Sequence, residues 1–111
     1  MNTWLVGFQT QIANIETFVH VLIEAENLEM AEAGAMHMGR TWWPVLKGED
    51  SDHCWTYQEG TVWFCSIILL DDVEKSVLIG LRFLDTWSIT GTKERLDAID
   101  HYDNYWEEYT R

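Results

Sequence analysis

Basic side chains are scarce in this sequence, and their scarcity argues against one class of function. The chain has seven Lys and Arg against 19 Asp and Glu, so its formal net charge is −12. A field of that sign repels the phosphates of nucleic acids and of anionic membranes. The basic residues are also scattered and form no cluster that could follow a phosphate backbone. We therefore expect no direct binding to nucleic acid or to a membrane.

Proline, glycine and cysteine are also few. One proline and seven glycines, in a chain that is 47% hydrophobic, argue against a disordered or low-complexity protein. The length of 111 residues favours a single domain, 1–111, with its own core. Two cysteines are too few for a disulfide framework, and we interpret Cys54 and Cys65 as reduced thiols. A disulfide bond between them is the alternative, if the two residues face each other across a hairpin.

Long apolar runs are missing as well. The longest, from Val62 to Leu70, is interrupted by Ser66 and is shorter than the roughly 18 residues that span a bilayer. The first 15 residues contain no Lys or Arg, unlike the start of a secretory signal. Together with reduced cysteines, these features predict a cytoplasmic protein.

Familiar catalytic and cofactor motifs are absent: the sequence has no glycine-rich phosphate loop, HExxH, GxSxG or CxxC. Asp97 and His101 have the spacing of a helical metal pair, but two ligands do not make a site. Cys65 is expected to be buried as a small hydrophobe. His53 and Cys54 are adjacent on an expected strand, so they would point to opposite faces. We expect no metal, no cofactor and no catalytic residue, which favours a protein that is not an enzyme.

Hydrophobic periodicity predicts five strands and two helices in the order β-β-α-β-β-β-α. The expected strands cover 3–12, 16–24, 53–58, 61–70 and 76–84. Apolar spacings of three and four predict a helix from the N-cap Asn27, with Gly39 and Pro44 marking its end, and another from Thr92 to about Trp106 or Tyr109. Short connections throughout predict an α+β domain with an antiparallel sheet of about five strands.

Two segments carry more specific expectations. Thr61–Leu70 is apolar on both faces, which predicts a central strand with both Ile67 and Ile68 buried. Residues 45–52 lack periodicity and are expected to form a loop.

The end of the chain is the strongest candidate for a binding surface. If this segment is a helix, four of its carboxylates form one stripe, about 5 Å apart along the axis: Asp97, Asp100, Asp103 and Glu107. Two tyrosines, Tyr105 and Tyr109, lie beside this stripe. In charge density such a row resembles the phosphates of a nucleic-acid strand, so it would attract a basic protein. The alternative is that these acids only keep a small protein soluble. Because Glu107 and Glu108 would oppose the helix dipole, we favour a partner.

Seven tryptophans form the second notable group. Trp4, Trp63 and Trp106 fall on expected core faces. Four other aromatic residues have no predicted cover: Trp42, Trp43, Trp55 and Tyr57. They would line a pocket for a small ligand or be buried in a homodimer.

These observations favour a non-enzymatic interaction protein that binds and blocks a basic protein, for example one that handles nucleic acid. In size and charge the chain resembles immunity proteins against toxin nucleases and phage-encoded inhibitors, although no motif supports this likeness. Two alternatives stay open: a ligand-binding or enzymatic domain with an aromatic pocket, and a structural homo-oligomer.

Overall fold

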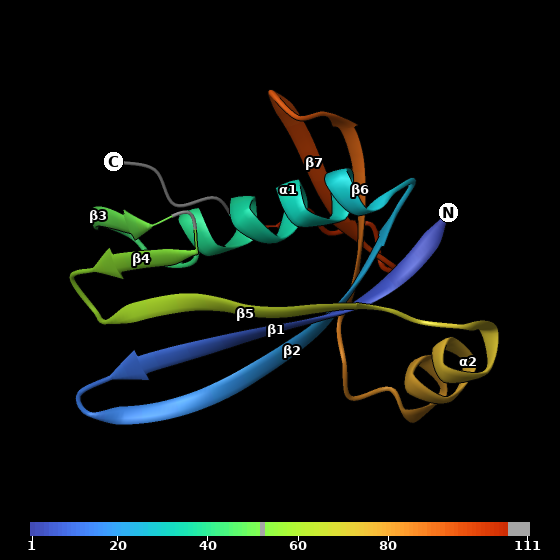
Figure 1. Cartoon of the computed structure of the whole chain (residues 1–111), viewed down its shortest axis with the longest axis horizontal. Coiled ribbons are helices and arrows are strands. Elements are labelled where there is room, and N and C mark those ends of the chain that lie inside the picture. Colours follow the sequence, from blue (N-terminus) through green and yellow to red (C-terminus); the bar gives the residue numbers. More distant parts are fainter. Residues whose placement is uncertain (52, 107–111) are drawn as a thin grey trace.

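The computed structural model describes residues 1–51 and 53–106, and the strands in these ranges form one mixed sheet of seven (Figure 1). They are β1 (Asn2–Ile12), β2 (Ile15–Ala25), β3 (Leu46–Ser51), β4 (Cys54–Tyr57), β5 (Thr61–Leu69), β6 (Thr86–Thr92) and β7 (Arg95–Asp100). Their spatial order is β3-β4-β5-β1-β2-β6-β7. Neighbours run antiparallel except β2 and β6, which are parallel.

Two helices complete this α+β fold, α1 (Leu28–Arg40) and α2 (Asp72–Leu81). The predicted α+β class is confirmed, whereas the predicted order of elements and the position of the second helix are wrong. The prediction of about five antiparallel strands is wrong in detail, because the described chain has seven strands and one parallel pair. Neither helix is long and apolar enough to cross a membrane.

The helix α1 covers one face of the sheet and begins where the sequence predicts. The side-chain Oδ1 of Asn27 caps it by accepting the backbone N–H of Met30 at 2.9 Å. Its buried face is made mostly of small residues: Ala31, Gly34, Ala35, Met38 and Gly39. A methyl group on Gly34 would overlap Ile89, and one on Gly39 would overlap the ring of Trp55. Because glycine has no side chain at positions 34 and 39, α1 can lie close to the sheet.

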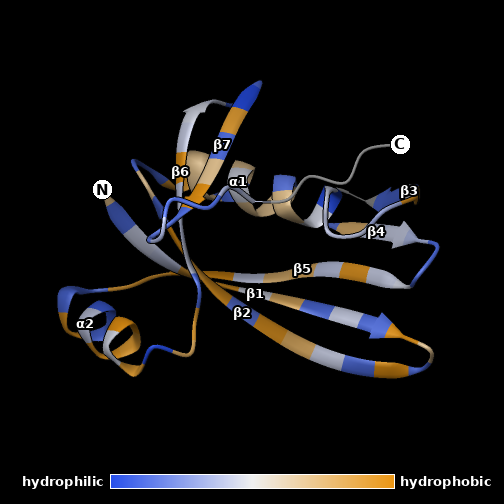
Figure 2. Cartoon of the chain, turned by 180° about the vertical axis from the view of Figure 1, so that it is seen from behind, coloured by the Kyte–Doolittle hydropathy of each residue, from blue (hydrophilic) through white to orange (hydrophobic). Residues whose placement is uncertain are grey.

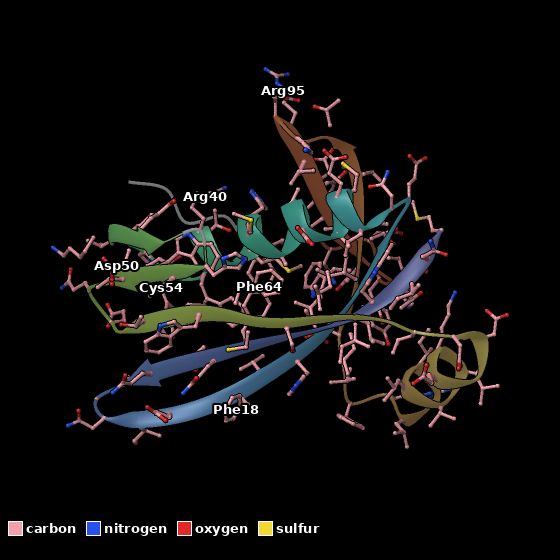
Figure 3. The ribbon with its side chains drawn as sticks, in the orientation of Figure 1. Phe18, Arg40, Asp50, Cys54, Phe64 and Arg95 are labelled. Atoms are coloured by element: carbon pink, nitrogen blue, oxygen red, sulfur yellow. The ribbon has the colours of Figure 1, made fainter. Side chains whose placement is uncertain are left out.

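The core lies between α1 and the inward-facing residues of the strands. The strands predicted over residues 3–12 and 16–24 are confirmed, and they form the antiparallel β1–β2 hairpin, in which Val6 lies opposite Val21. Phe64 points from β5 toward α1, whereas Phe18 lies on β2 at the side of the molecule away from α1 (Figure 3). The largest fully buried side chains are Trp55, Phe8, Leu22, Ile23, Met38 and Ile89.

The helix α2 replaces the strand predicted over residues 76–84, so that prediction is wrong. Asp71 and Glu74 form a capping box: the Asp71 carboxylate accepts the N–H of Glu74 at 2.8 Å, and the Glu74 carboxylate accepts the N–H of Asp71 at 3.0 Å. These bonds satisfy two backbone donors that a helix start leaves unpaired. The helix ends at Arg82, in the left-handed region with φ 61°.

The helix predicted from Thr92 is also wrong, because this part of the chain is the β6–β7 hairpin. Lys93 and Glu94 form its turn, and Thr92 pairs with Arg95. The Thr92 hydroxyl accepts the N–H of Arg95 at 3.2 Å. The side chain of a helix N-cap also accepts the N–H of the residue three positions later. A threonine at this position is therefore compatible with a helix start and with a hairpin turn.

Two further predictions are corrected. Residues 46–51 form the edge strand β3, not a loop, and its polar sequence explains why periodicity did not reveal it. The strand β5 lies inside the sheet between β4 and β1, as expected. However, Ile68 is 54% exposed, so the prediction that both isoleucines are buried is wrong. The reason is that α1 covers only the opposite face of β5.

Candidate functional site

The predicted acidic residues lie on β7 and in the turn that follows it. Asp97 is exposed on β7, and Asp103 is exposed in the turn. Asp97 and Asp100 are three positions apart on a strand, so they point to opposite faces and share no helical stripe. The prediction that these carboxylates form one row along a helix is therefore wrong. Glu107 and Tyr109 lie outside the described residues.

Asp100 accepts hydrogen bonds that organise the turn. Its Oδ1 accepts the backbone N–H groups of Tyr102 and Asn104, both at 2.8 Å. Its Oδ2 accepts the side-chain amide of Asn104 at 3.2 Å. Desolvation acts to raise the pKa of Asp100, but these hydrogen bonds and the nearby His101 outweigh it and hold the pKa below its ordinary value.

We expect this turn to loosen in acid. A carboxylate with a lowered pKa contributes stability at higher pH and loses it as the pH falls through its folded pKa, which here lies below the ordinary value of 3.8. In an NMR titration, the amide protons of Tyr102 and Asn104 should therefore shift below that pH. In the control Asp100→Asn the same amides should show no such transition. Equal transitions in both proteins would contradict the role of Asp100.

Exposed tyrosines accompany these acids. Tyr102 is 85% exposed and Tyr105 is 66% exposed. Tyr105 lies opposite Ile99 in a β-bridge, so both occupy the face that also carries Asp97. We call the set Asp97, Tyr102, Asp103 and Tyr105 the acidic edge.

The acidic edge is anchored by the next residue, Trp106. Its Nε1–H donates to the Thr41 hydroxyl at 2.8 Å. Its ring centroid lies 5.6 Å from that of Trp42 and 5.3 Å from that of Trp87. The turn is therefore attached to the core at the C-terminal end of α1.

The four aromatic residues predicted to lack cover do come together, at the C-terminal end of α1. Trp55 and Tyr57 are buried, and Trp42 and Trp43 are half-buried. The Tyr57 hydroxyl donates to the carbonyl of Gly39 and accepts the N–H of Trp42 at 3.1 Å. Burial raises the pKa of Tyr57, so the phenol stays protonated. Trp55 and Tyr57 belong to the hydrophobic core, and Trp42 and Trp43 pack against it.

The two cysteines are free. Cys54 pairs with Trp63 in the sheet register, so it does not face Cys65. Cys65 lies at an irregularity of the β1–β5 pairing and is exposed, which corrects its predicted burial. Burial and then the charge of Asp50 raise the pKa of Cys54, which disfavours a reactive thiolate.

Metal chemistry finds little support in residues 1–51 and 53–106, where no three His, Cys, Asp or Glu side chains could hold a metal ion together. His101, considered earlier with Asp97, has its Nε2 2.9 Å from Oε1 of Glu24. A cavity of about 370 Å³ lies beside this pair, between the turn and the segment after α2. Sequence reasoning missed this cavity because no local motif links Arg82 and Asp85 to His101.

Comparisons with known proteins identified no similar protein. No family model matches the chain, and no match was found among curated proteins or solved structures.

Proposed function

We propose that the protein is a non-enzymatic interaction protein that binds and blocks a basic protein through the acidic edge. The observation that carries the proposal is the exposure of two tyrosines, Tyr102 and Tyr105, beside the exposed carboxylates of Asp97 and Asp103. This combination suits a protein-binding surface, in which aromatic anchors supply contact area and charges around them set orientation.

The charge pattern supports a basic partner. From residue 96 to 108 the sequence has five acidic residues and no Lys or Arg: Asp97, Asp100, Asp103, Glu107 and Glu108. The net charge of −12 adds a long-range field of the same sign. A protein whose own site binds nucleic acid would present the complementary positive surface. Occupying that surface would block its function, as immunity proteins and phage-encoded inhibitors do.

The Asp100 turn supports the same proposal. Three hydrogen bonds from Tyr102 and Asn104 to the Asp100 carboxylate fix the backbone that presents the tyrosines. A surface that is ordered before binding loses less entropy on binding.

The experiment begins with capture of basic proteins from the native host at low and moderate salt, followed by binding kinetics with the captured protein. Asp97→Asn with Asp103→Asn should slow association several-fold and flatten its salt dependence, because steering fades within about 8 Å at physiological salt. Tyr105→Ala should speed dissociation on the order of tenfold, as expected for an anchor of about 1–2 kcal/mol.

The matched control is Glu16→Gln with Glu59→Gln, which removes the same charge from exposed positions at the β1–β2 hairpin and the β4–β5 turn. This control should change association less than the acidic-edge pair. If the affinity of the captured partner is insensitive to both acidic-edge variants, the acids are only a solvated surface and the proposal fails.

A further inference from the structure

The cavity beside His101 has walls from two parts of the chain that are distant in sequence. One wall is the C-terminal end of α2 with the segment that leads into β6, and the other is the end of β7 with the turn that follows it. The helix α2 lies at the opposite end of the molecule from β3 and β4 (Figure 1), and it carries hydrophobic and hydrophilic residues side by side (Figure 2). The cavity volume of about 370 Å³ is near the lower end of the range of about 300–1,000 Å³ that is typical of small-molecule sites.

Both walls of the cavity are attached to the same strand, β2. On one wall, the backbone carbonyl of Asp85 accepts the N–H of Leu22 at 2.9 Å. On the other wall, Nε2 of His101 lies 2.9 Å from Oε1 of Glu24. Because these contacts exist in the protein alone, the cavity is formed before a ligand binds, which reduces the entropy that binding costs.

Two side chains of opposite charge line this cavity without pairing to each other. Neither Arg82 nor Asp85 makes a side-chain hydrogen bond or an ion pair within the part of the chain that the structure describes. A guanidinium group presents a fork of donors that matches a carboxylate. A carboxylate such as that of Asp85 accepts hydrogen bonds from an ammonium group. The cavity therefore offers a ligand one group of each sign.

The other charged side chains of the cavity already have partners. The two carboxylate oxygens of Asp100 accept three hydrogen bonds from Tyr102 and Asn104, and His101 contacts Glu24. The negative charge of Asp100 still adds to that of Asp85, so both attract a positively charged group. Arg82 is then the group in the cavity that is free to bind an anion.

Apolar surface completes the cavity. Ile79 and Leu84 are half-buried and line it beside the charged groups. An aliphatic group that packs on them leaves water, which adds affinity. A ligand that matches all three features has a carboxylate, an ammonium group and an aliphatic side chain, and an aliphatic α-amino acid is the simplest molecule of this kind.

We propose that this cavity binds an aliphatic α-amino acid, with the ligand carboxylate on Arg82 and the ligand ammonium group on Asp85. The aliphatic side chain packs on Ile79 and Leu84. A carboxylic acid or an amine alone leaves one of the two charged side chains without a partner, so it binds more weakly. The cavity shares only Tyr102 with the acidic edge, and the inference uses neither Tyr102 nor the proposed function.

The first test is an NMR titration of the full chain at neutral pH with leucine, isoleucine and valine. At least one of them should bind with a dissociation constant on the order of 0.1–1 mM, as expected for a ligand of this size. N-acetylleucine lacks the ammonium group and leucine amide lacks the carboxylate, so each should bind at least about tenfold more weakly than leucine. Glycine keeps both charges but has no aliphatic side chain, and it should also bind more weakly. The inference is overturned if none of the three amino acids binds at up to about 20 mM, far above that range. It is also overturned if N-acetylleucine and leucine amide bind as well as leucine does.

The second test assigns the two ligand charges to the two side chains. Arg82→Gln should weaken leucine binding at least about tenfold but leave the affinity for leucine amide unchanged, because leucine amide has no carboxylate to lose. Asp85→Asn should weaken leucine binding to a similar extent and leave the affinity for N-acetylleucine unchanged. The matched controls are Arg95→Gln and Asp72→Asn, which change exposed residues outside the cavity and should bind leucine as the parent does; Arg95 lies at the far end of the β6–β7 hairpin (Figure 3). Circular dichroism checks that each variant keeps its fold. Folded Arg82→Gln and Asp85→Asn variants with the parent's affinity for leucine would contradict the proposed site.

Discussion

Trp55→Ala should lower the free energy of unfolding by about 3–5 kcal/mol, the largest effect we expect from one substitution in this chain. Trp55 is fully buried between β4 and α1, so its removal leaves a cavity beneath the helix. Because domains of this size are stable by only about 5–15 kcal/mol, the variant should be barely folded at room temperature. Urea unfolding followed by circular dichroism measures the loss without relying on tryptophan fluorescence.

Trp55→Phe is the matched control for this prediction. It keeps an aromatic ring and removes the indole N–H, which has no hydrogen-bond partner among the described residues. Removing an unsatisfied buried donor offsets part of the lost packing, so the loss should be smaller than for alanine. Equal losses in the two variants would show that ring packing against α1 is not what stabilises this part of the core.

Gly39→Ala should destabilise the protein by about 1–3 kcal/mol, although alanine is the better helix former. The new methyl group would overlap the six-membered ring of Trp55. Gly80→Ala in α2 is the control, since no atom beyond its chain neighbours and the backbone of its own helix lies within 4 Å of the added carbon. It should stabilise the helix by up to about 1 kcal/mol. Both substitutions replace glycine with alanine in a helix. Opposite changes in the free energy of unfolding would therefore be due to the close approach of Gly39 to the Trp55 ring.

A double-mutant cycle tests the same contact. In a Trp55→Leu background, Gly39→Ala should lose most of its effect, because the ring it strikes is gone. An unchanged cost of Gly39→Ala in that background would place the strain elsewhere. The free energies come from the same urea measurements, compared at equal m-values.

Local signals predicted the parts of the fold in which they agree. Asn27, followed by apolar residues at helical spacing, predicted α1, and period-two alternation predicted the β1–β2 hairpin. The signals conflicted in the region of α2, because alternation over residues 76–84 suggests a strand, whereas the Asp71–Glu74 capping box starts a helix. At Thr92 the local hydrogen bond is common to a helix cap and a hairpin turn, so the sequence could not separate them.

Sequence reasoning predicted the exposure of several candidate residues but not their arrangement in space. Asp97, Asp103 and Tyr105 were expected to face a partner, and they are exposed, but on a strand and a turn. Asp100 was grouped with them because its hydrogen bonds within the turn depend on a backbone conformation that the sequence does not reveal. The burial of Trp55 depends on Gly39 in another element, which is a tertiary contact without a local signature.

The parallel pairing of β2 with β6 has a consequence for synthesis on the ribosome. Leu22 pairs with Thr86, which lies 64 residues later in the chain. At about 5–20 residues per second, roughly 3–13 s pass between the synthesis of the two partners. During that interval β2 can pair with β1, but its other edge offers unpaired backbone groups to any extended chain nearby. The nascent protein is therefore more open to aggregation before its last hairpin emerges, and β6 then covers the part of this edge formed by Leu22, Ile23 and Glu24.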